Sequence, residues 1–485
     1  MIRAISEDSW SQPPGWIRCQ MRLEFYQPFS FGGIIMKKPI QIYIRFLLAT
    51  FGSALVMSIY SIVDSVCVGQ YHQEAGTAAL AVIMPLWTMI YSCGLLFGIG
   101  GATLLSSARG RGDDSKANAY FTLSCILTAV TAAVLWGIIA LGLDRFIVFF
   151  GAKTPEIYDL AQKYAFWMKV ALPVFMATQL LSCFVRNDNA PLTATLAVIS
   201  GGAFNIIGDI FFVFDFGLGM GISGAGLATM IGQFITVGVL LSHFLRKRNT
   251  LRFVKIKHIG RKSLQILKIG FSAFILDIAM GFLTILFNNQ INRYTNNDAN
   301  TLAIYGVICN IVALVQSLAY AVGQASQPLL STSYGENNLV NIRKYNRYAL
   351  ITAVVIGVAA ATVILCLPNP LIRLFINTSG NAEILKMAPG IIRGYFLCLP
   401  FLILNIYASY FFQSILKPNF SFIISLLRGI VLPFGLVLLF PAVFGFSAIW
   451  YAMPVSEGIV FVCMICFMIR NIRGLSRRIS LENMV

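Results

Sequence analysis

The chain carries two acidic residues inside long apolar segments, where ionised groups are costly. Asp64 interrupts the apolar run 43–67, and Asp209 interrupts the run 191–215. A carboxylate at bilayer depth is disfavoured by roughly 3 kcal/mol on insertion scales, and it commonly marks an ion or substrate pathway. The run 191–215 contains no Lys or Arg that would neutralise Asp209. These acids therefore predict transport chemistry.

Two further oxygen-bearing side chains stand near Asp209 in the sequence. Asn205 is four residues earlier, so both share one helix face, and Thr229 opens the next apolar run after a glycine-rich turn. Carboxylate, amide and hydroxyl oxygens suit a hard cation such as Na⁺, while a desolvated Asp suits H⁺ equally well. The alternative is that these groups only hold helices together. We predict a cation-coupling site of Asp64, Asn205, Asp209 and Thr229, with no cofactor and no other metal.

The composition predicts the elements that position these residues. The chain has 485 residues, of which 58% are hydrophobic and 11% charged, whereas soluble domains are about 25% charged. Apolar runs long enough to cross a ~30 Å hydrocarbon core recur along the chain, and lipid forces them to be helical. The predicted fold is therefore an all-α integral membrane protein with twelve transmembrane helices, at 43–67, 78–107, 118–143, 162–185, 191–215, 222–245, 264–289, 301–332, 346–368, 387–413, 419–441 and 447–470.

The two halves of the chain repeat one another. An offset of 225 places Gly98 on Gly323 and Gly110 on Gly335, and an offset of 227 places Pro191 on Pro418. Six helices per half give both halves the same orientation, which predicts two pseudo-symmetric six-helix bundles in a parallel repeat. The predicted parts are an N-terminal extension that is disordered or a mistaken start (1–35), a first bundle (36–246), a basic linker (247–262), a second bundle (263–471) and a tail (472–485).

The net charge of +17 is concentrated in a few connections. The linker between the sixth and seventh runs is the most basic of them, while the connections 68–77, 216–221 and 442–446 hold no Lys or Arg. By the positive-inside rule the linker and both termini are cytoplasmic, in a multi-pass protein of the cell (inner) membrane. This distribution disfavours a nucleic-acid partner. Membrane lipids are the expected surroundings of a monomer.

The second half lacks the first half's set of polar residues. Asn289 stands at the position equivalent to Asp64, and Glu457 at the position equivalent to Gln233. Asp277 adds an acid in the seventh run. If Asp277, Asn289, Glu457 and Gln233 face a central cavity, they form a substrate pathway for small organic cations. Aromatic residues such as Tyr91 and Tyr320 would add cation–π surfaces there.

Several stretches together resemble the multidrug and toxic compound extrusion (MATE) transporters over about 36–470. They are 62–69 (IVDSVCVG), 98–103 (GIGGAT), 109–112 (RGRG), 184–191 (FVRNDNAP), 205–209 (NIIGD), 221–229 (GISGAGLAT), 327–335 (QPLLSTSYG) and 453–457 (MPVSE). The resemblance implies export of organic cations and drugs, with Na⁺ or H⁺ entering in exchange. It also implies a coupling site in the first bundle, whose motif positions fall on Asp64, Asn205, Asp209 and Thr229.

We therefore predict a cation-coupled antiporter that works by alternating access. One alternative is a flippase for lipid-linked oligosaccharides or precursors in the same broad superfamily, which would need a wide basic cavity. A membrane enzyme is disfavoured, because no cluster of His, Cys or Ser with a base stands at bilayer level. No GxxxxGK[ST] loop is present, so an ion gradient must supply the energy.

Overall fold

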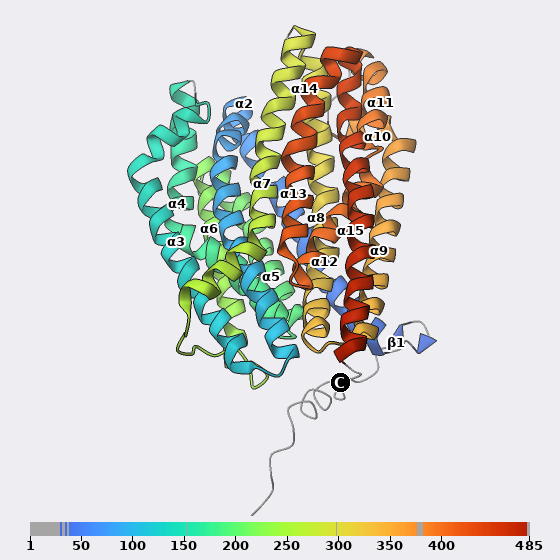
Figure 1. The fold of residues 1–485 in the computed structure, drawn as a ribbon. Helices are drawn as coiled ribbons and strands as arrows, with labels where there is room; N and C mark the ends of the chain where they lie inside the picture. Colours follow the sequence, from blue (N-terminus) through green and yellow to red (C-terminus); the bar gives the residue numbers. More distant parts are fainter. Residues whose placement is uncertain are drawn as a thin grey trace, which may run out of the picture.

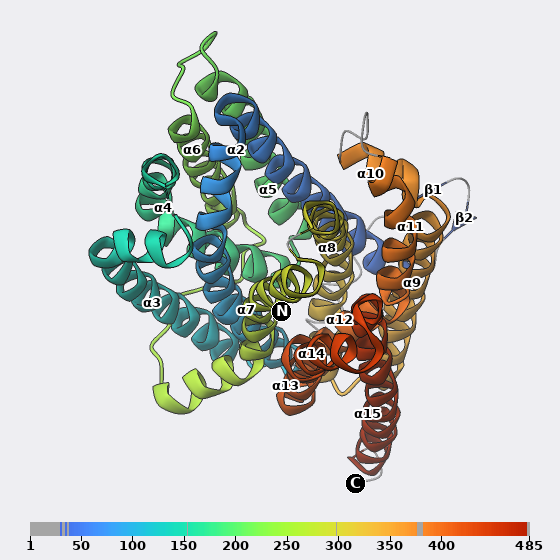
Figure 2. The ribbon, with the colours of Figure 1, turned by 90° about the horizontal axis from the view of Figure 1, so that it is seen from above.

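The computed structural model describes residues 30–31, 34–35, 38–152, 154–296, 298–375 and 382–482. Two-residue strands β1 (Ser30–Phe31) and β2 (Ile34–Ile35) pair antiparallel. Everything else that is regular in the described part is helical, and the helices stand side by side in two groups (Figures 1 and 2). The all-α membrane fold is confirmed. Apart from these strands, the extension 1–35 lies outside the described residues.

The first group contains five helices and a short 3₁₀ turn. They are α2 (Lys38–Gly110), α3 (Asp114–Phe149), α4 (Pro155–Asn187), α5 (Pro191–Val213), α6 (Ile222–Leu241) and η1 (Ser242–Leu245). Pro155 and Pro191 begin α4 and α5, because a first-turn proline gives up no helical hydrogen bond. Side-chain oxygens of Asp113 and Thr154 cap α3 and α4.

The second group contains the remaining elements. They are α7 (Ile259–Thr295), α8 (Ala299–Gly335), α9 (Leu339–Cys366), α10 (Pro368–Phe375), α11 (Ala382–Phe396), α12 (Leu399–Ser414), α13 (Pro418–Leu426), the π-helical turn η2 (Leu427–Val431), α14 (Leu432–Phe444), the 3₁₀ turn η3 (Phe446–Tyr451) and α15 (Ala452–Glu482). α7 begins inside the predicted linker 247–262, and α15 continues through most of the predicted tail 472–485.

Eleven helices in the described ranges are long and apolar enough to cross a membrane. The first of them, α2, has 73 residues, about 110 Å at 1.5 Å per residue, which is far longer than a single ~30 Å crossing requires. Its backbone leaves the helical conformation at Gln73, where φ is 52° and ψ is −133°. α2 is therefore two crossings joined at a sharp bend, and twelve crossings result, as predicted.

Backbone conformation confirms the repeat. Residues with positive φ recur at equivalent positions of the two halves: Gly112 and Asn337, Asn189 and Leu416, Gly221 and Gly445. Each pair follows the end of a corresponding helix or precedes the start of one. Positive φ is uncommon outside glycine, so its recurrence at Asn189 and Leu416 shows that the same turn is built twice.

The two bundles are in close contact at the end of the molecule that carries the linker, which we call the linker face. α2 of the first bundle contacts both α7 and α8 of the second. Gly110 and Gly335, equivalent residues of the repeat, lie against each other so closely that a Cβ on Gly110 would stand 2.9 Å from the Cα of Gly335. Near them, Asn187 donates to Gln327 (3.1 Å) and Gln327 donates to Thr103 (2.7 Å). The linker face is closed.

Candidate functional site

Asp64 and Asp209 come together inside the first bundle, from the first crossing of α2 and from α5. Asp209 is fully buried and Asp64 is half-buried, and the two carboxylates are close enough to interact electrostatically. Gly201 of α5 packs against Gly232 of α6, and Gly208 packs against Ala228. These glycines let the helices approach closely, which brings α6 up to the acids.

The predicted amide and hydroxyl also belong to this cluster. Asn205 donates from Nδ2 to the Thr229 hydroxyl at 3.0 Å, and both side chains are buried. Asn205 therefore presents its carbonyl oxygen to the interior, and that oxygen has no hydrogen-bond partner among the described residues. Both Asp209 oxygens and Asp64 Oδ1 lack partners there as well. Buried polar atoms are normally satisfied, and a cation or a proton is the kind of partner that would satisfy this concentration of lone pairs.

Tyr164 of α4 is a member of the cluster that the sequence did not indicate. Its hydroxyl donates to Asp64 Oδ2 at 3.2 Å and lies beside Thr229. It thus connects α2, α4 and α6 at a single point. A tyrosine in an apolar helix is ordinarily a packing residue, and no spacing in the sequence relates residue 164 to residue 64.

Asp277 lies at the boundary between the bundles. Ser92 of α2 donates to its Oδ2 at 3.1 Å, and Tyr320 of α8 donates to its Oδ1 at 3.4 Å. Asp277 lines a small cavity of about 30 Å³ together with residues of α2, α7, α8, α12 and α13, among them Tyr91, Tyr320, Gln324, Tyr410 and Gln413. A carboxylate surrounded by tyrosine rings is suited to a cationic ligand.

The other predicted pathway residues have different surroundings. Glu457 is fully buried and paired with Arg428, whose Nε lies 2.6 Å from Oε1, and Asn405 donates to Oε2 at 2.7 Å. This pair leaves Glu457 no free charge for a ligand. Asn289 is exposed on α7. Gln233, on α6 one turn beyond Thr229, is half-buried with an unpartnered Oε1 in the described structure.

Comparison with known proteins agrees with this architecture. The MatE family model matches residues 49–211 and 273–438, one segment in each bundle. The chain is 22% identical over 411 residues to "Multidrug export protein MepA" of Staphylococcus saprophyticus, covering 84% of this chain and 88% of that protein. It is 24% identical over 343 residues to the protein of the same name from Staphylococcus haemolyticus, covering 70% and 74%.

Solved structures share the fold. A multidrug resistance MATE family transporter of the MOP superfamily, described as outward-facing, matches with a TM-score of 0.83 and 19% identity over 90% of this chain and 97% of that one. A MOP superfamily transporter from Pyrococcus furiosus, described as having a binding pocket of reverse polarity, matches with a TM-score of 0.82 and 20% identity at the same coverage. The chain therefore belongs to the MATE (MatE) family of membrane transporters.

Proposed function

We propose that the protein exports organic cations and drugs in exchange for Na⁺ or H⁺, by alternating access. The observation that carries the proposal is the pair of carboxylates in the first bundle with unpartnered oxygens and no basic residue bonded to them in the described structure. A permanently unpaired buried charge is costly, so the site is suited to a cation that binds and leaves. The relatives named as multidrug export proteins support the cargo class.

The exchange follows from two states with unequal affinities. The positive-inside rule assigns the basic linker face to the cytoplasm, so the closed linker face corresponds to a transporter that cannot take up cytoplasmic cargo. In the proposed cycle, a cation enters the Asp64–Asp209 site from outside, neutralises it and changes the packing of α2, α5 and α6. Cargo then leaves and the bundles swing back. The cation drives this change only if it binds the two states unequally.

Alternating access requires that the glycine contact at the linker face open and close. Replacing Gly110 by Ala places a methyl group against the backbone of Thr332 and Gly335. Overpacking of this kind costs about 1–3 kcal/mol, or roughly tenfold or more in the ratio of closed to open states. Cys183 lies beside Gly98, about three helical turns deeper along α2 than Gly110. We expect maleimide to label Cys183 correspondingly faster in the variant, measured by mass spectrometry of the labelled peptide.

The matched control for this substitution is Gly137→Ala on α3, where an added methyl group meets nothing within 4 Å. This control should leave the labelling rate of Cys183 at the wild-type value. Equal rates for the wild type, Gly137→Ala and Gly110→Ala would contradict the claim that close glycine packing closes the linker face.

Asp277 is proposed to attract the cargo. Asp277→Asn keeps the hydrogen-bonding shape of the side chain but removes its charge. Since a hydrogen bond to a charged group contributes about 1.5–3 kcal/mol, we expect the KM for a cationic fluorescent substrate to rise about tenfold or more. The dependence of transport on the Na⁺ or H⁺ gradient should stay unchanged. Asp144→Asn, at the exposed Asp144 that accepts from Gln162, is the control, and an unchanged KM for Asp277→Asn would contradict the assignment.

The cavity that Asp277 lines between the bundles does not support the flippase alternative. A pyrophosphate-linked substrate would need basic side chains there, whereas the cavity presents Asp277 and tyrosine hydroxyls. Arg428, a buried basic residue of the second bundle, is held by Glu457.

The proposed exchange is tested with purified protein in liposomes. A fluorescent organic cation is supplied, and an inward Na⁺ gradient or an inward pH gradient is imposed separately. One of the two gradients should drive substrate transport, and dissipating it with the matching ionophore should stop it. Transport that proceeds equally without either gradient would refute cation coupling.

A further inference from the structure

The linker and the start of α7 form an unusually basic surface. Residues 246–268, which we call the basic strip, contain nine Lys and Arg and no Asp or Glu, out of a net charge of +17 for the whole chain. The connection between α2 and α3 on the same face mixes both signs, with Asp113 and Asp114 beside Arg109, Arg111 and Lys116. The positive-inside rule accounts for basic residues on the cytoplasmic side, but it does not require that acidic residues be absent there.

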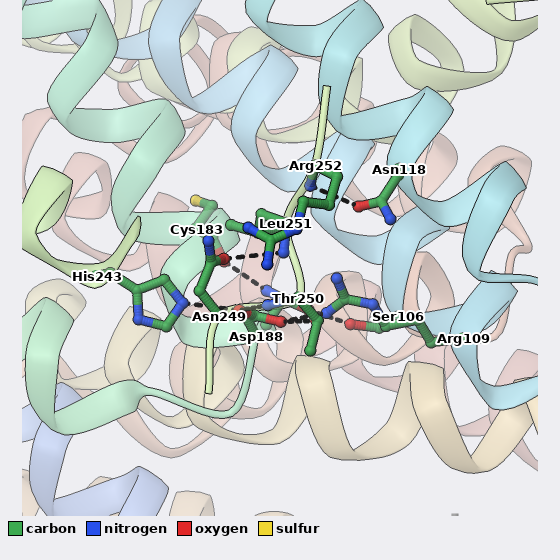
Figure 3. A network of polar contacts seen from close by, with 11 residues as sticks. Ser106, Arg109, Asn118, Cys183, Asp188, His243, Asn249, Thr250, Leu251 and Arg252 are labelled. Atoms are coloured by element: carbon green, nitrogen blue, oxygen red, sulfur yellow. Dashed lines mark hydrogen bonds and ion pairs between the residues drawn. The ribbon is translucent and has the colours of Figure 1, made fainter. Parts of the chain in front are cut away.

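A buried carboxylate fixes the linker to the first bundle. Asp188, just after α4, accepts hydrogen bonds from Arg109 Nη1 (2.6 Å), His243 Nε2 (2.7 Å), the Thr250 backbone N–H (3.0 Å) and the Thr250 hydroxyl (Figure 3). Although burial opposes ionisation, the bonds from His243, Arg109 and Thr250 hold the pKa of Asp188 below its usual value. Asp188 is thus a charged anchor.

Beyond Thr250 the linker lies along α3. The Asn118 side-chain oxygen accepts from the Arg252 backbone N–H, and the Thr122 hydroxyl accepts from the Val254 N–H, both at 3.0 Å. Its backbone is thereby held while its basic side chains point outward: Arg252, Lys255 and Lys257 are exposed. The ring of Phe253, between them, is 70% exposed.

The strip continues into the first turns of α7. This helix has 37 residues, about 55 Å, and therefore exceeds a ~30 Å crossing; its first turns extend outward beside α3 (Figures 1 and 2). Tyr120 of α3 donates to Gln265 there. Ile259 and Leu264 are 56% and 52% exposed, next to the exposed Arg261. Apolar and basic side chains together are typical of a segment at the headgroup level of a membrane.

We propose that the basic strip is a binding surface for anionic phospholipids, whose phosphates pair with Lys255, Lys257 and Arg261 while Phe253, Ile259 and Leu264 enter the acyl boundary. Juxtamembrane basic clusters bind anionic headgroups in this way. The strip is anchored on the first bundle and runs directly into the second. A lipid bound there contacts the linker that joins the two bundles, so it acts on their relative movement.

The experiment uses the full chain in neutral detergent, with phosphatidylglycerol or phosphatidylcholine added, and measures the thermal unfolding midpoint and the lipids retained in native mass spectrometry. Wild type should gain stability and retain lipid with phosphatidylglycerol only. The triple variant Lys255→Gln, Lys257→Gln, Arg261→Gln should bind phosphatidylglycerol about ten- to a hundredfold more weakly. The control Lys344→Gln, Arg347→Gln, Arg473→Gln removes equal charge at other exposed positions and should behave like wild type.

A second variant tests the anchor. Thr250→Val removes the hydroxyl bond to Asp188 but keeps every basic residue. It should weaken phosphatidylglycerol binding severalfold, with the lipid-induced shift of the unfolding midpoint measured from the variant's own midpoint in lipid-free detergent. Equal lipid responses of the two triple variants would overturn the site, and an unaffected Thr250→Val would overturn the role of the anchor. Inorganic phosphate or a short oligonucleotide that matches the phosphatidylglycerol effect would overturn the lipid assignment. None of these readouts depends on transport.

Discussion

Cells that express Asp209→Asn should retain a fluorescent organic cation as fully as cells with an empty vector, at equal protein level in the membrane. Asp209 is fully buried, and neither of its oxygens has a partner in the described structure. An amide of the same shape cannot take up a proton and holds Na⁺ far less well than a carboxylate. Asp64→Asn should have a similar effect, because the two acids form one site.

The control for both substitutions is Asp159→Asn on α4. Asp159 is exposed and paired with Lys163 on the surface, and surface pairs contribute at most about 1 kcal/mol. Efflux by this variant should equal that of wild type. Wild-type efflux from Asp209→Asn would remove the basis for assigning coupling to the first bundle.

Glu457→Ala should destabilise the protein by about 3–5 kcal/mol, because it leaves the buried Arg428 without its partner. Arg428 and Glu457 are 3% and 0% exposed, and no other acid forms an ion pair with Arg428 in the described residues. The thermal unfolding midpoint in detergent, followed by size-exclusion chromatography, measures the effect. Replacing both residues, with Arg428→Met and Glu457→Leu, should recover most of the loss.

This pair also separates structure from transport in the second bundle. The double variant lacks Glu457 altogether, yet it should still export cargo if the pair only holds α12, η2 and α15 together. Lys163→Ala, which breaks an exposed pair, should change the midpoint very little. If Glu457→Ala is as stable as the wild type but has lost efflux, Glu457 belongs to the substrate pathway instead.

The sequence predicted those features that depend on local pattern. Apolar run length and the positions of Gly110, Pro191 and their equivalents gave twelve helices and two bundles, since a helix in lipid needs only its own hydrogen bonds. Asp64 and Asp209 were conspicuous because a charge in an apolar run is rare. Asn205 followed from its spacing of four on the same helix.

What the sequence did not reveal depends on contacts between distant segments. Tyr164 reaches Asp64 across 100 positions, and Arg428 reaches Glu457 across 29, with no periodicity to relate them. Asp188 lies in the stretch 184–191, one of those that resemble MATE transporters. Its role as the anchor for Thr250 could not be predicted, because this bond forms only where the linker folds back onto the first bundle. Glu457, an acid in the last apolar run, is therefore predicted to line a substrate pathway if it faces a cavity, whereas in the structure it is buried and paired with Arg428.

The most direct test of the account measures the ion rather than the cargo. Liposomes containing the purified protein are given an outward gradient of an organic cation, with no ion gradient, and the counter-movement of radioactive Na⁺ or of protons is recorded. Wild type should move one of these ions inward only when cargo is present, and Asp209→Asn should move neither. Cargo efflux without any ion movement in the wild type, or undiminished ion movement in Asp209→Asn, would contradict the account.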